Sequence, residues 1–362
     1  MKLVANPWRG RGLPKGAVEM RETLLADPAP VLSLLAHCPH AAKTPLVQSA
    51  DLARKLGVQD LYFKDERARM GLGSFKALGA AYAIARDAHD ARGDAIFAPK
   101  TAATALAGRV YCCASAGNHG LSMAAGARVF GASAVIFIAE TVPESFAERL
   151  AAFGARVIRQ GQDYEASMAA AKRAATAKSW HLLSDTSWPG YAAAPQAVMQ
   201  GYLVLGSEIA EQWPVPPPSH VFLQAGVGGL AAAVAVGLRR IWGDGFHISV
   251  VEPAAAPALQ ASIEAGKPVV TSGPVSNMGR LDCKEPSHLA LAALAIQADN
   301  FLTLDDDAVA QAIDDLPAFG FQTTPSGGAG YAGLRAMAAA GLAGLGADSR
   351  VLVILSECVD DA

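Results

Sequence analysis

Short aliphatic runs separated by alanine-rich stretches dominate the pattern of this sequence. Consecutive β-branched and aliphatic residues are typical of strands that are buried on both faces. Such runs occupy Ala134–Ile138, His220–Leu223, His247–Glu252 and Arg350–Leu355. The stretches between them favour helices by composition and length, as in Ser122–Val129 and Leu230–Trp242. Strands and helices therefore alternate along the chain.

This alternation predicts an α/β protein whose sheet is mostly parallel and covered by helices on both faces. A length of 362 residues fits one large domain or two domains of medium size. Residues 1–43 show little periodicity, and we expect them to form an N-terminal arm that packs over the body.

Composition and charge narrow the classes of partner. Hydrophobic residues make up 52% of the chain, charged residues 17%, and the formal net charge is −3. Nothing in this balance favours nucleic acid or an anionic membrane surface. No apolar run reaches the roughly 18 residues of a bilayer span, and the N-terminus lacks the apolar core of a secretory signal. The five cysteines are an odd number without metal-ligand spacing. We therefore expect reduced thiols, no metal, and a soluble cytoplasmic protein.

Two glycine-rich turns each follow a predicted strand and precede a predicted helix. They are Ala114–Gly120, with the sequence ASAGNHG, and Gln224–Leu230, with the sequence QAGVGGL. Such turns present backbone N–H groups at a helix N-terminus and suit anionic ligands at the carboxyl ends of strands. Neither turn is a G-x-G-x-x-G fingerprint, and no Gly-Lys-Ser/Thr follows, which excludes a P-loop.

Lys76 stands out among the lysines. It follows Gly73-Ser74-Phe75 and precedes a segment rich in Ala, Leu and Gly. Loss of solvation among such neighbours would disfavour the ammonium form, and a neutral amine is the form that adds to an aldehyde. The alternative is an ordinary surface lysine in a first helical turn. Asn118, in the first glycine-rich turn, could donate to a phenolate oxygen, and the same turn could grip a carboxylate or be purely structural.

Four motifs occur in the order found in fold-type-II pyridoxal-phosphate enzymes, the group of threonine and serine dehydratases, serine racemase and cysteine synthase. These motifs are SFK around Lys76, SAGNHG, GVGG, and Ser356 after the last strand. Within that group the chain most resembles the diaminopropionate ammonia-lyases. The segments that carry this likeness are FKDERARMGLGSFKALGAAYA, Ser184–Tyr202, Met278–Leu289 and Val351–Asp361.

The resemblance implies two open, twisted, mostly parallel sheets covered by helices. Residues 1–80 and 190–362 would form a large domain that binds pyridoxal 5′-phosphate, and residues 81–189 a small substrate-side domain. It also implies an amino-acid substrate and a homodimer.

The resemblance further assigns roles to matching positions. Lys76 would hold the cofactor and act as base at the substrate Cα, with Phe75 beside it. The phenolate oxygen would meet Asn118, and the pyridine nitrogen would meet Ser356. The phosphate would lie in the turn formed by Gly226, Val227, Gly228, Gly229 and Leu230. The substrate carboxylate would lie against Ser115, Ala116, Gly117 and His119. Of these, His119 is better explained as scaffold of the loop than as a general base.

Asp185 corresponds to an acid of the ammonia-lyase site. It would bind the β-ammonium of the substrate or help to protonate the leaving amine. The alternative is a cap of the turn in SDTSW.

Some positions depart from the family pattern. The ammonia-lyases carry an aspartate directly before Gly-Asn-His-Gly, which serves as base for the D-isomer, whereas this chain has Ala116. We therefore expect a preference for the L-isomer. Asp282 stands where the family favours a small residue. Its charge would lie either near the substrate or on the surface. Thr324 replaces a glutamate that is common among the dehydratases.

The favoured function is β-elimination of ammonia from L-2,3-diaminopropionate, or a close β-substituted alanine, to give a 2-keto acid. One alternative is a dehydratase acting on serine, threonine or hydroxyaspartate. A different class would be a non-catalytic protein that binds pyridoxal phosphate, but such a protein has no need of Lys76.

Overall fold

A computed structural model of the chain describes residues 1–20, 22–214, 216–342 and 344–359. Asp360 and Asp361, the last two residues of the C-terminal motif, lie outside these ranges. The described strands are β1 (Lys2–Ala5), β2 (Leu46–Gln48), β3 (Asp60–Asp65), β4 (Val110–Ala114), β5 (Ser133–Ile138), β6 (Ala155–Arg159), β7 (His181–Leu182), β8 (His220–Gln224), β9 (His247–Pro253), β10 (Asn300–Leu304) and β11 (Arg350–Leu355).

The described helices begin and end at the following residues: α1 (Ala29–Leu35), α2 (Ala50–Leu56), α3 (Gly79–Arg92), α4 (Pro99–Ala102), α5 (Asn118–Val129), α6 (Glu144–Ala152), α7 (Tyr164–Lys178), α8 (Ala193–Gln212), α9 (Gly229–Trp242), α10 (Ala258–Ala265), α11 (His288–Gln297), α12 (Asp306–Asp314) and α13 (Pro325–Ala339). Short 3₁₀ helices lie at η1 (Arg69–Gly71), η2 (Phe75–Leu78), η3 (Gly93–Phe97) and η4 (Leu316–Phe319).

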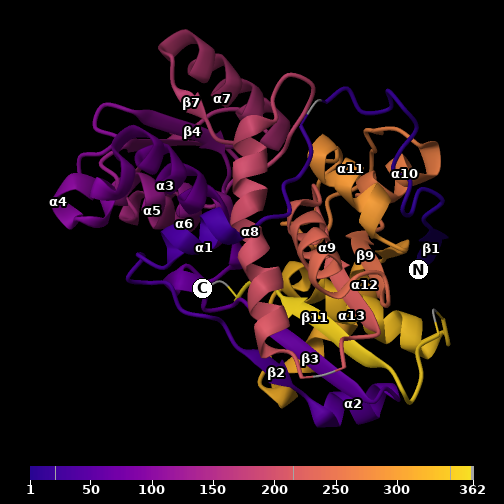
Figure 1. Cartoon of the computed structure of the whole chain (residues 1–362). Coiled ribbons are helices and arrows are strands. Elements are labelled where there is room, and N and C mark those ends of the chain that lie inside the picture. Colours follow the sequence, from indigo (N-terminus) through magenta and orange to yellow (C-terminus); the bar gives the residue numbers. More distant parts are fainter. Residues whose placement is uncertain (21, 215, 343, 360–362) are drawn as a thin grey trace.

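The strands form two sheets (Figure 1). The larger has the order β1-β10-β9-β8-β11-β3-β2, and the smaller has the order β6-β5-β4-β7. The two edge strands of the larger sheet, β1 and β2, pair antiparallel with their neighbours, and the other pairings in both sheets are parallel. The predicted α/β class with mostly parallel sheets is confirmed.

Helices cover both faces of the larger sheet, whose central strands carry buried apolar side chains on both sides. In β8, Val221 and Leu223 face the core that includes α8, α9 and α11, whereas Phe222 faces the opposite core with α2, α12 and α13. Successive side chains point to opposite faces, as expected for a strand that is buried on both sides. Continuous apolar runs therefore predicted β5, β8, β9 and β11 correctly.

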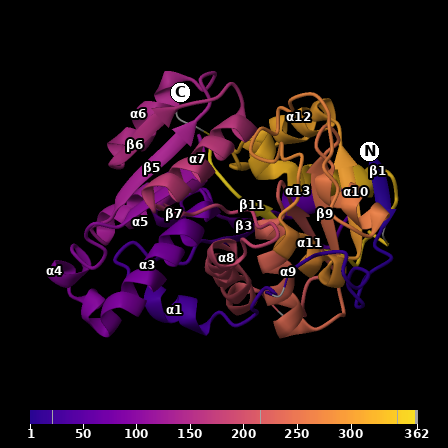
Figure 2. The same ribbon diagram turned by 90° about the horizontal axis from the view of Figure 1, so that it is seen from above.

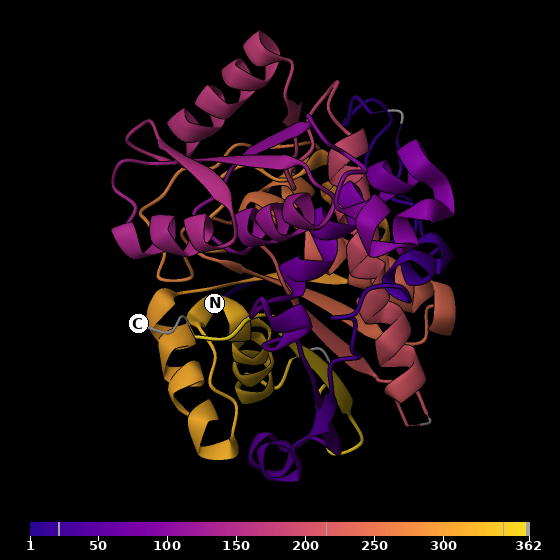
Figure 3. The same ribbon diagram turned by 90° about the vertical axis from the view of Figure 1, so that its left-hand side faces the viewer.

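Helix α8 runs between the two sheets. Seen from above, α3, α5, α6 and the smaller sheet lie on one side of it, and β9, α13 and the rest of the larger sheet lie on the other (Figure 2). With the left side of Figure 1 turned toward the viewer, the magenta elements occupy the upper part of the molecule (Figure 3). The strands of the smaller sheet come from residues 110–182; the division into two domains, with boundaries at residues 81 and 189, stays a prediction.

The N-terminal arm is only partly as expected. Lys2–Ala5 forms an edge strand that pairs antiparallel with β10, and Ala29–Leu35 forms a helix. The strand has only four residues, too few to show a pattern, and its pairing partner lies about 300 residues further along the chain. Among the described residues, none of the helices has the length and apolar character required to cross a membrane.

Candidate active site

Lys76 lies in η2, which is fixed against the end of β11. The Ser74 hydroxyl accepts the N–H of Lys76 at 3.2 Å, and the N–H of Phe75 donates to the carbonyl of Ser356 at 3.0 Å. The Phe75 ring packs edge-on against Tyr202 of α8, with 4.9 Å between ring centroids. A Cβ on Gly201 would lie only 2.1 Å from the carbonyl oxygen of Leu78. The glycine therefore lets the backbone of α8 approach the lysine-bearing turn.

Lys76 and Asp185 form an ion pair. Nζ of Lys76 donates to Oδ2 of Asp185 at 2.6 Å, and the two side chains are 24% and 16% exposed. Burial acts to lower the pKa of Lys76, but the charge and hydrogen bond of Asp185 outweigh it, so that pKa is raised. Burial acts to raise the pKa of Asp185, but the charge and hydrogen bond of Lys76 hold it well below its usual range.

This charge state corrects one expectation. The sequence favoured a lysine whose ammonium form is disfavoured by burial, whereas here the carboxylate of Asp185 stabilises the ammonium. The surface-lysine alternative is also wrong, because the side chain is largely buried and paired. Asp185 is directed at Lys76, which a turn cap in SDTSW does not explain.

The segment that carries Asp185 is tied to its neighbours on both sides. The hydroxyl of Tyr191 accepts the N–H of Ser184 at 3.0 Å and donates to the carbonyl of Leu182 at 2.8 Å. The hydroxyls of Ser187 and Ser287 lie 2.8 Å apart, and Ser287 directly precedes α11. Asp185 is therefore held in place by the chain immediately before and after it.

The loop from Ser115 to His119 packs beside this pair at the N-terminus of α5. Oγ of Ser115 accepts the N–H groups of Gly117 at 3.3 Å and Gly120 at 3.2 Å. His119 is buried, its Nε2 bonds the carbonyl oxygen of Leu183 at 2.7 Å, and burial lowers its pKa. A neutral, fixed imidazole favours the scaffold interpretation of His119. Ala116, also in this loop, is partly buried against the core.

Glu357 lies at the site but was not predicted from the sequence. Its side chain is buried, and it accepts hydrogen bonds from Nδ2 of Asn118 at 2.8 Å, Nη1 of Arg280 at 2.9 Å and Oγ1 of Thr324 at 2.5 Å. The available signal was an acidic residue directly after Ser356 and the apolar strand β11. Glu357 therefore joins the predicted cofactor ligands Asn118 and Ser356 to Arg280.

The second glycine-rich turn leads into α9 and packs against Cys283 and Tyr202. Gly228 has a φ of +99°, which favours glycine, and Gly229 begins α9. A Cβ on Gly226 would lie 3.0 Å from Sγ of Cys283, and one on Gly229 would lie 3.7 Å from Cε2 of Tyr202. The carbonyl of Val227 accepts the N–H of Ser287 at 3.0 Å, and Leu230 is buried in the first turn of α9. Tyr202 thus lies between Phe75 and this turn.

Other positions singled out by the sequence have structural partners. Asp282 forms an ion pair with Lys284. Thr324 caps α13 by accepting the N–H of Gly327 at 2.9 Å. Cys112 and Cys113 are buried in β4, where burial raises the pKa of both thiols. These two cysteines therefore act as packing residues.

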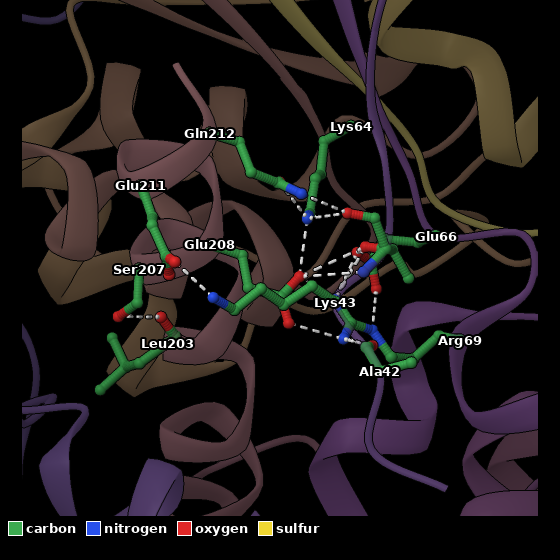
Figure 4. Close-up of polar contacts among 11 residues, drawn as sticks. Ala42, Lys43, Lys64, Glu66, Arg69, Leu203, Ser207, Glu208, Glu211 and Gln212 are labelled. Carbon is green, nitrogen blue, oxygen red and sulfur yellow. Dashed lines mark hydrogen bonds and ion pairs between the residues drawn. The ribbon is translucent and has the colours of Figure 1, made fainter.

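A buried charge network anchors the segment that leads to Lys76 (Figure 4). Arg69 bonds both oxygens of Glu66, at 2.7 Å each, and both oxygens of Glu208 in α8, at 2.8 and 2.7 Å. Lys64 donates to Glu208 at 2.6 Å. Burial acts to raise the pKa of Glu208, but Arg69 and Lys64 outweigh it and hold the pKa low. Met70, directly after Arg69, has a φ of 51°. The ion pairs of the network hold this strained backbone in place, five residues before Phe75.

Comparisons with known proteins agree with this geometry. Residues 38–357 match the family model described as "Pyridoxal-phosphate dependent enzyme". The chain is 32% identical over 291 residues to the diaminopropionate ammonia-lyase of Salmonella typhimurium, covering 76% of this chain and 72% of that protein. A probable D-serine dehydratase of Paracidovorax citrulli is 27% identical, covering 80% of this chain and 69% of that protein.

A solved structure shows the same fold. The crystal structure of diaminopropionate ammonia-lyase from Escherichia coli, in complex with an aminoacrylate–PLP azomethine reaction intermediate, superposes with a TM-score of 0.87 at 27% identity. The match covers 99% of this chain and 94% of that one.

Proposed function

The chain belongs to the pyridoxal-phosphate-dependent enzyme family, and to its diaminopropionate ammonia-lyase branch; from this premise we propose that it eliminates ammonia from L-2,3-diaminopropionate. The overall reaction takes diaminopropionate and water to pyruvate and two molecules of ammonia. A close β-substituted alanine with a cationic leaving group falls within the same proposal.

The residues present fit the cofactor. Lys76 is largely buried, and its amine could link to an aldehyde once it has lost its proton. The turn Gly226–Gly229 carries a positive φ at Gly228 and leads into the N-terminus of α9, a donor set that suits a phosphate. Lys76, Asn118, Ser356 and this turn would hold pyridoxal phosphate, with Phe75 and Leu230 packing around them.

When bound, the cofactor supplies an aldehyde that links to amines and a ring that draws electrons from the substrate Cα. Lys76 Nζ is the group placed to accept the Cα proton. It works as a base only in its neutral form, so the ion pair with Asp185 must be broken or shared while the proton moves. The Ser115–His119 loop would bind the α-carboxylate through its backbone N–H groups.

Asp185 distinguishes an ammonia-lyase from a dehydratase. Its depressed pKa keeps it a carboxylate, which suits attraction of a β-ammonium better than donation of a proton. Once Lys76 is engaged with the cofactor, a substrate β-ammonium can replace the lysine as partner. The 2.6 Å contact between Asp185 and an ammonium nitrogen is the observation that carries the proposal.

A substrate panel tests this function. The purified holoenzyme is given L-2,3-diaminopropionate, L-serine, L-threonine or 3-hydroxyaspartate, and keto acid and ammonia are measured together. We expect diaminopropionate to give the highest kcat/KM and two ammonia molecules per pyruvate. A Lys76→Ala variant is the control for cofactor-linked activity. Faster turnover of a hydroxy amino acid, with one ammonia per keto acid, would contradict the proposal.

Faster turnover of a hydroxy amino acid would instead support a dehydratase, the alternative that the likeness to the probable D-serine dehydratase favours. The higher identity to the ammonia-lyase supports the leading proposal. A non-catalytic pyridoxal-phosphate-binding protein would turn over none of the four substrates.

We also propose that the enzyme is cytoplasmic and forms a homodimer. The low charge and reduced-thiol pattern of the sequence support the first proposal. Support for the second comes from Val270 and Val275, which are 70% and 86% exposed on the segment before Arg280. Light scattering of the holoenzyme gives the mass, and a monomer at micromolar concentration would contradict the dimer.

A further inference from the structure

Arg280 stands between the two glycine-rich turns of the site. A Cβ on Gly117 would lie 3.8 Å from Nε of Arg280, and a Cβ on Gly226 would lie 3.3 Å from its carbonyl oxygen. The N–H of Arg280 donates to Oγ of Ser326 at 3.1 Å, which fixes the backbone. The side chain of Arg280 therefore extends from the glycine turn across to the Ser115–His119 loop.

Glu357 orients the guanidinium of Arg280. Nη1 of Arg280 donates to Oε1 of Glu357 at 2.9 Å, and Glu357 is only 3% exposed. The same carboxylate accepts from Asn118 and Thr324. Because these contacts fix one end of the guanidinium, its Nε atom is held at Gly117.

The loop itself offers little positive charge to a carboxylate. Oγ of Ser115 accepts two backbone N–H groups, and burial lowers the pKa of His119, so the imidazole is neutral. A guanidinium matches the two oxygens of a carboxylate and forms charge-assisted hydrogen bonds with it. Arg280 supplies the cation beside this loop, at 25% side-chain exposure.

We propose that Arg280 binds the α-carboxylate of the amino-acid substrate. This inference rests on the proposed function for its substrate class, an amino acid held next to the Ser115–His119 loop. It makes Arg280 a specificity-determining residue that selects free amino acids over their amides and esters.

Binding of an amino acid without a leaving group tests the proposal without relying on elimination. L-Alanine and L-alaninamide are titrated into holoenzyme by calorimetry, for the native chain and for Arg280→Met. We expect the variant to bind L-alanine about tenfold to a hundredfold more weakly, as for loss of a charged hydrogen bond. Its affinity for L-alaninamide should change less than about threefold, since the amide carries no charge.

Two further variants complete the design. Arg54→Met removes an exposed cation of α2, whose side chain is 77% exposed, and should leave both affinities unchanged. Arg280→Lys keeps the charge, and should bind L-alanine more tightly than Arg280→Met does. If Arg280→Met does not fold, Arg280→Lys serves in its place. Its preference for alanine over alaninamide should be weaker than that of the native enzyme.

The outcomes separate this inference from the proposed function. Equal weakening for alanine and alaninamide, or no change for alanine, would overturn the role of Arg280. Failure of diaminopropionate as substrate would leave the alanine titration valid, because L-alanine has no β-leaving group. In steady-state kinetics on the true substrate, Arg280→Met should raise KM more than it lowers kcat.

Discussion

Replacing Asp185 by asparagine removes one charge from the centre of the site while keeping its shape. In the structure the carboxylate accepts a hydrogen bond from Lys76 at 2.6 Å. If a substrate β-ammonium takes the place of the lysine, Asp185→Asn loses a charged contact with diaminopropionate. Serine, which has a neutral hydroxyl at the same carbon, loses much less.

The exposure of the pair decides the size of the effect. The side chains of Lys76 and Asp185 are 24% and 16% exposed. The free energy of this contact should therefore lie between that of a surface ion pair, about 0–1 kcal/mol, and the cost of breaking a buried ion pair, about 3–5 kcal/mol. A hydrogen bond to a charged group contributes about 1.5–3 kcal/mol, which corresponds to roughly a tenfold to hundredfold loss of kcat/KM for diaminopropionate.

The assay compares kcat/KM for diaminopropionate and serine in native enzyme, Asp185→Asn and the control Asp94→Asn, whose side chain is 85% exposed. A second measurement follows cofactor uptake by apoenzyme against pH. Because Asp185 raises the pKa of Lys76, the asparagine variant should lower that pKa and shift the uptake profile to lower pH. Equal loss on both substrates, with no shift of the profile, would refute the reasoning.

Three further outcomes are expected. Borohydride reduction of the holoenzyme followed by peptide mapping should place the pyridoxyl group on Lys76; a label on another lysine would overturn the whole site. L-Diaminopropionate should be turned over about 10²–10⁴ times faster than the D-isomer, because Ala116 offers no base to the opposite face, and Ala116→Asp should raise D-isomer activity; equal native kcat/KM values would reveal a base elsewhere. Burial raises the pKa of Glu252 from 4.5 to about 8, although the N–H groups of Leu259 and Gln260 donate to its carboxylate. The protonated Glu252 therefore contributes its full stabilisation below pH 4.5, and this stabilisation is lost as the pH rises through about 8. The fall of Tm between pH 5 and 8.5 should therefore be smaller in Glu252→Gln, and an unchanged fall would show that other groups cause it.

Buried strands were predictable from sequence and edge strands were not. β8 and β11 contain runs of consecutive apolar residues because helices cover both faces, and that signal is local. β1 has four residues, and its stability comes from pairing with β10 at the far end of the sequence. No window of the sequence contains both partners, so the N-terminal strand could not be predicted.

The candidate site divides in the same way. Motifs predicted Lys76, Asn118 and the glycine turn, because each depends on a few adjacent residues. The contact between Glu357 and Asn118 joins positions 239 residues apart, and that between Arg280 and Glu357 joins positions 77 apart. The charge of Lys76 was also misjudged, since burial was inferred from neighbours in sequence while Asp185 comes from 109 residues away.

The buried charge network that anchors the segment before Lys76 restricts which substitutions its residues can accept. Lys64, Glu66, Arg69 and Glu208 carry two positive and two negative charges, each less than 5% exposed. Losing one partner of a buried pair costs about 3–5 kcal/mol, out of a total stability of about 5–15 kcal/mol. Apolar replacements of all four could be neutral, but the intermediates carry an unpaired buried charge. Mutational paths away from this arrangement therefore pass through poorly folded proteins, and joint changes at positions 144 residues apart are needed to avoid them.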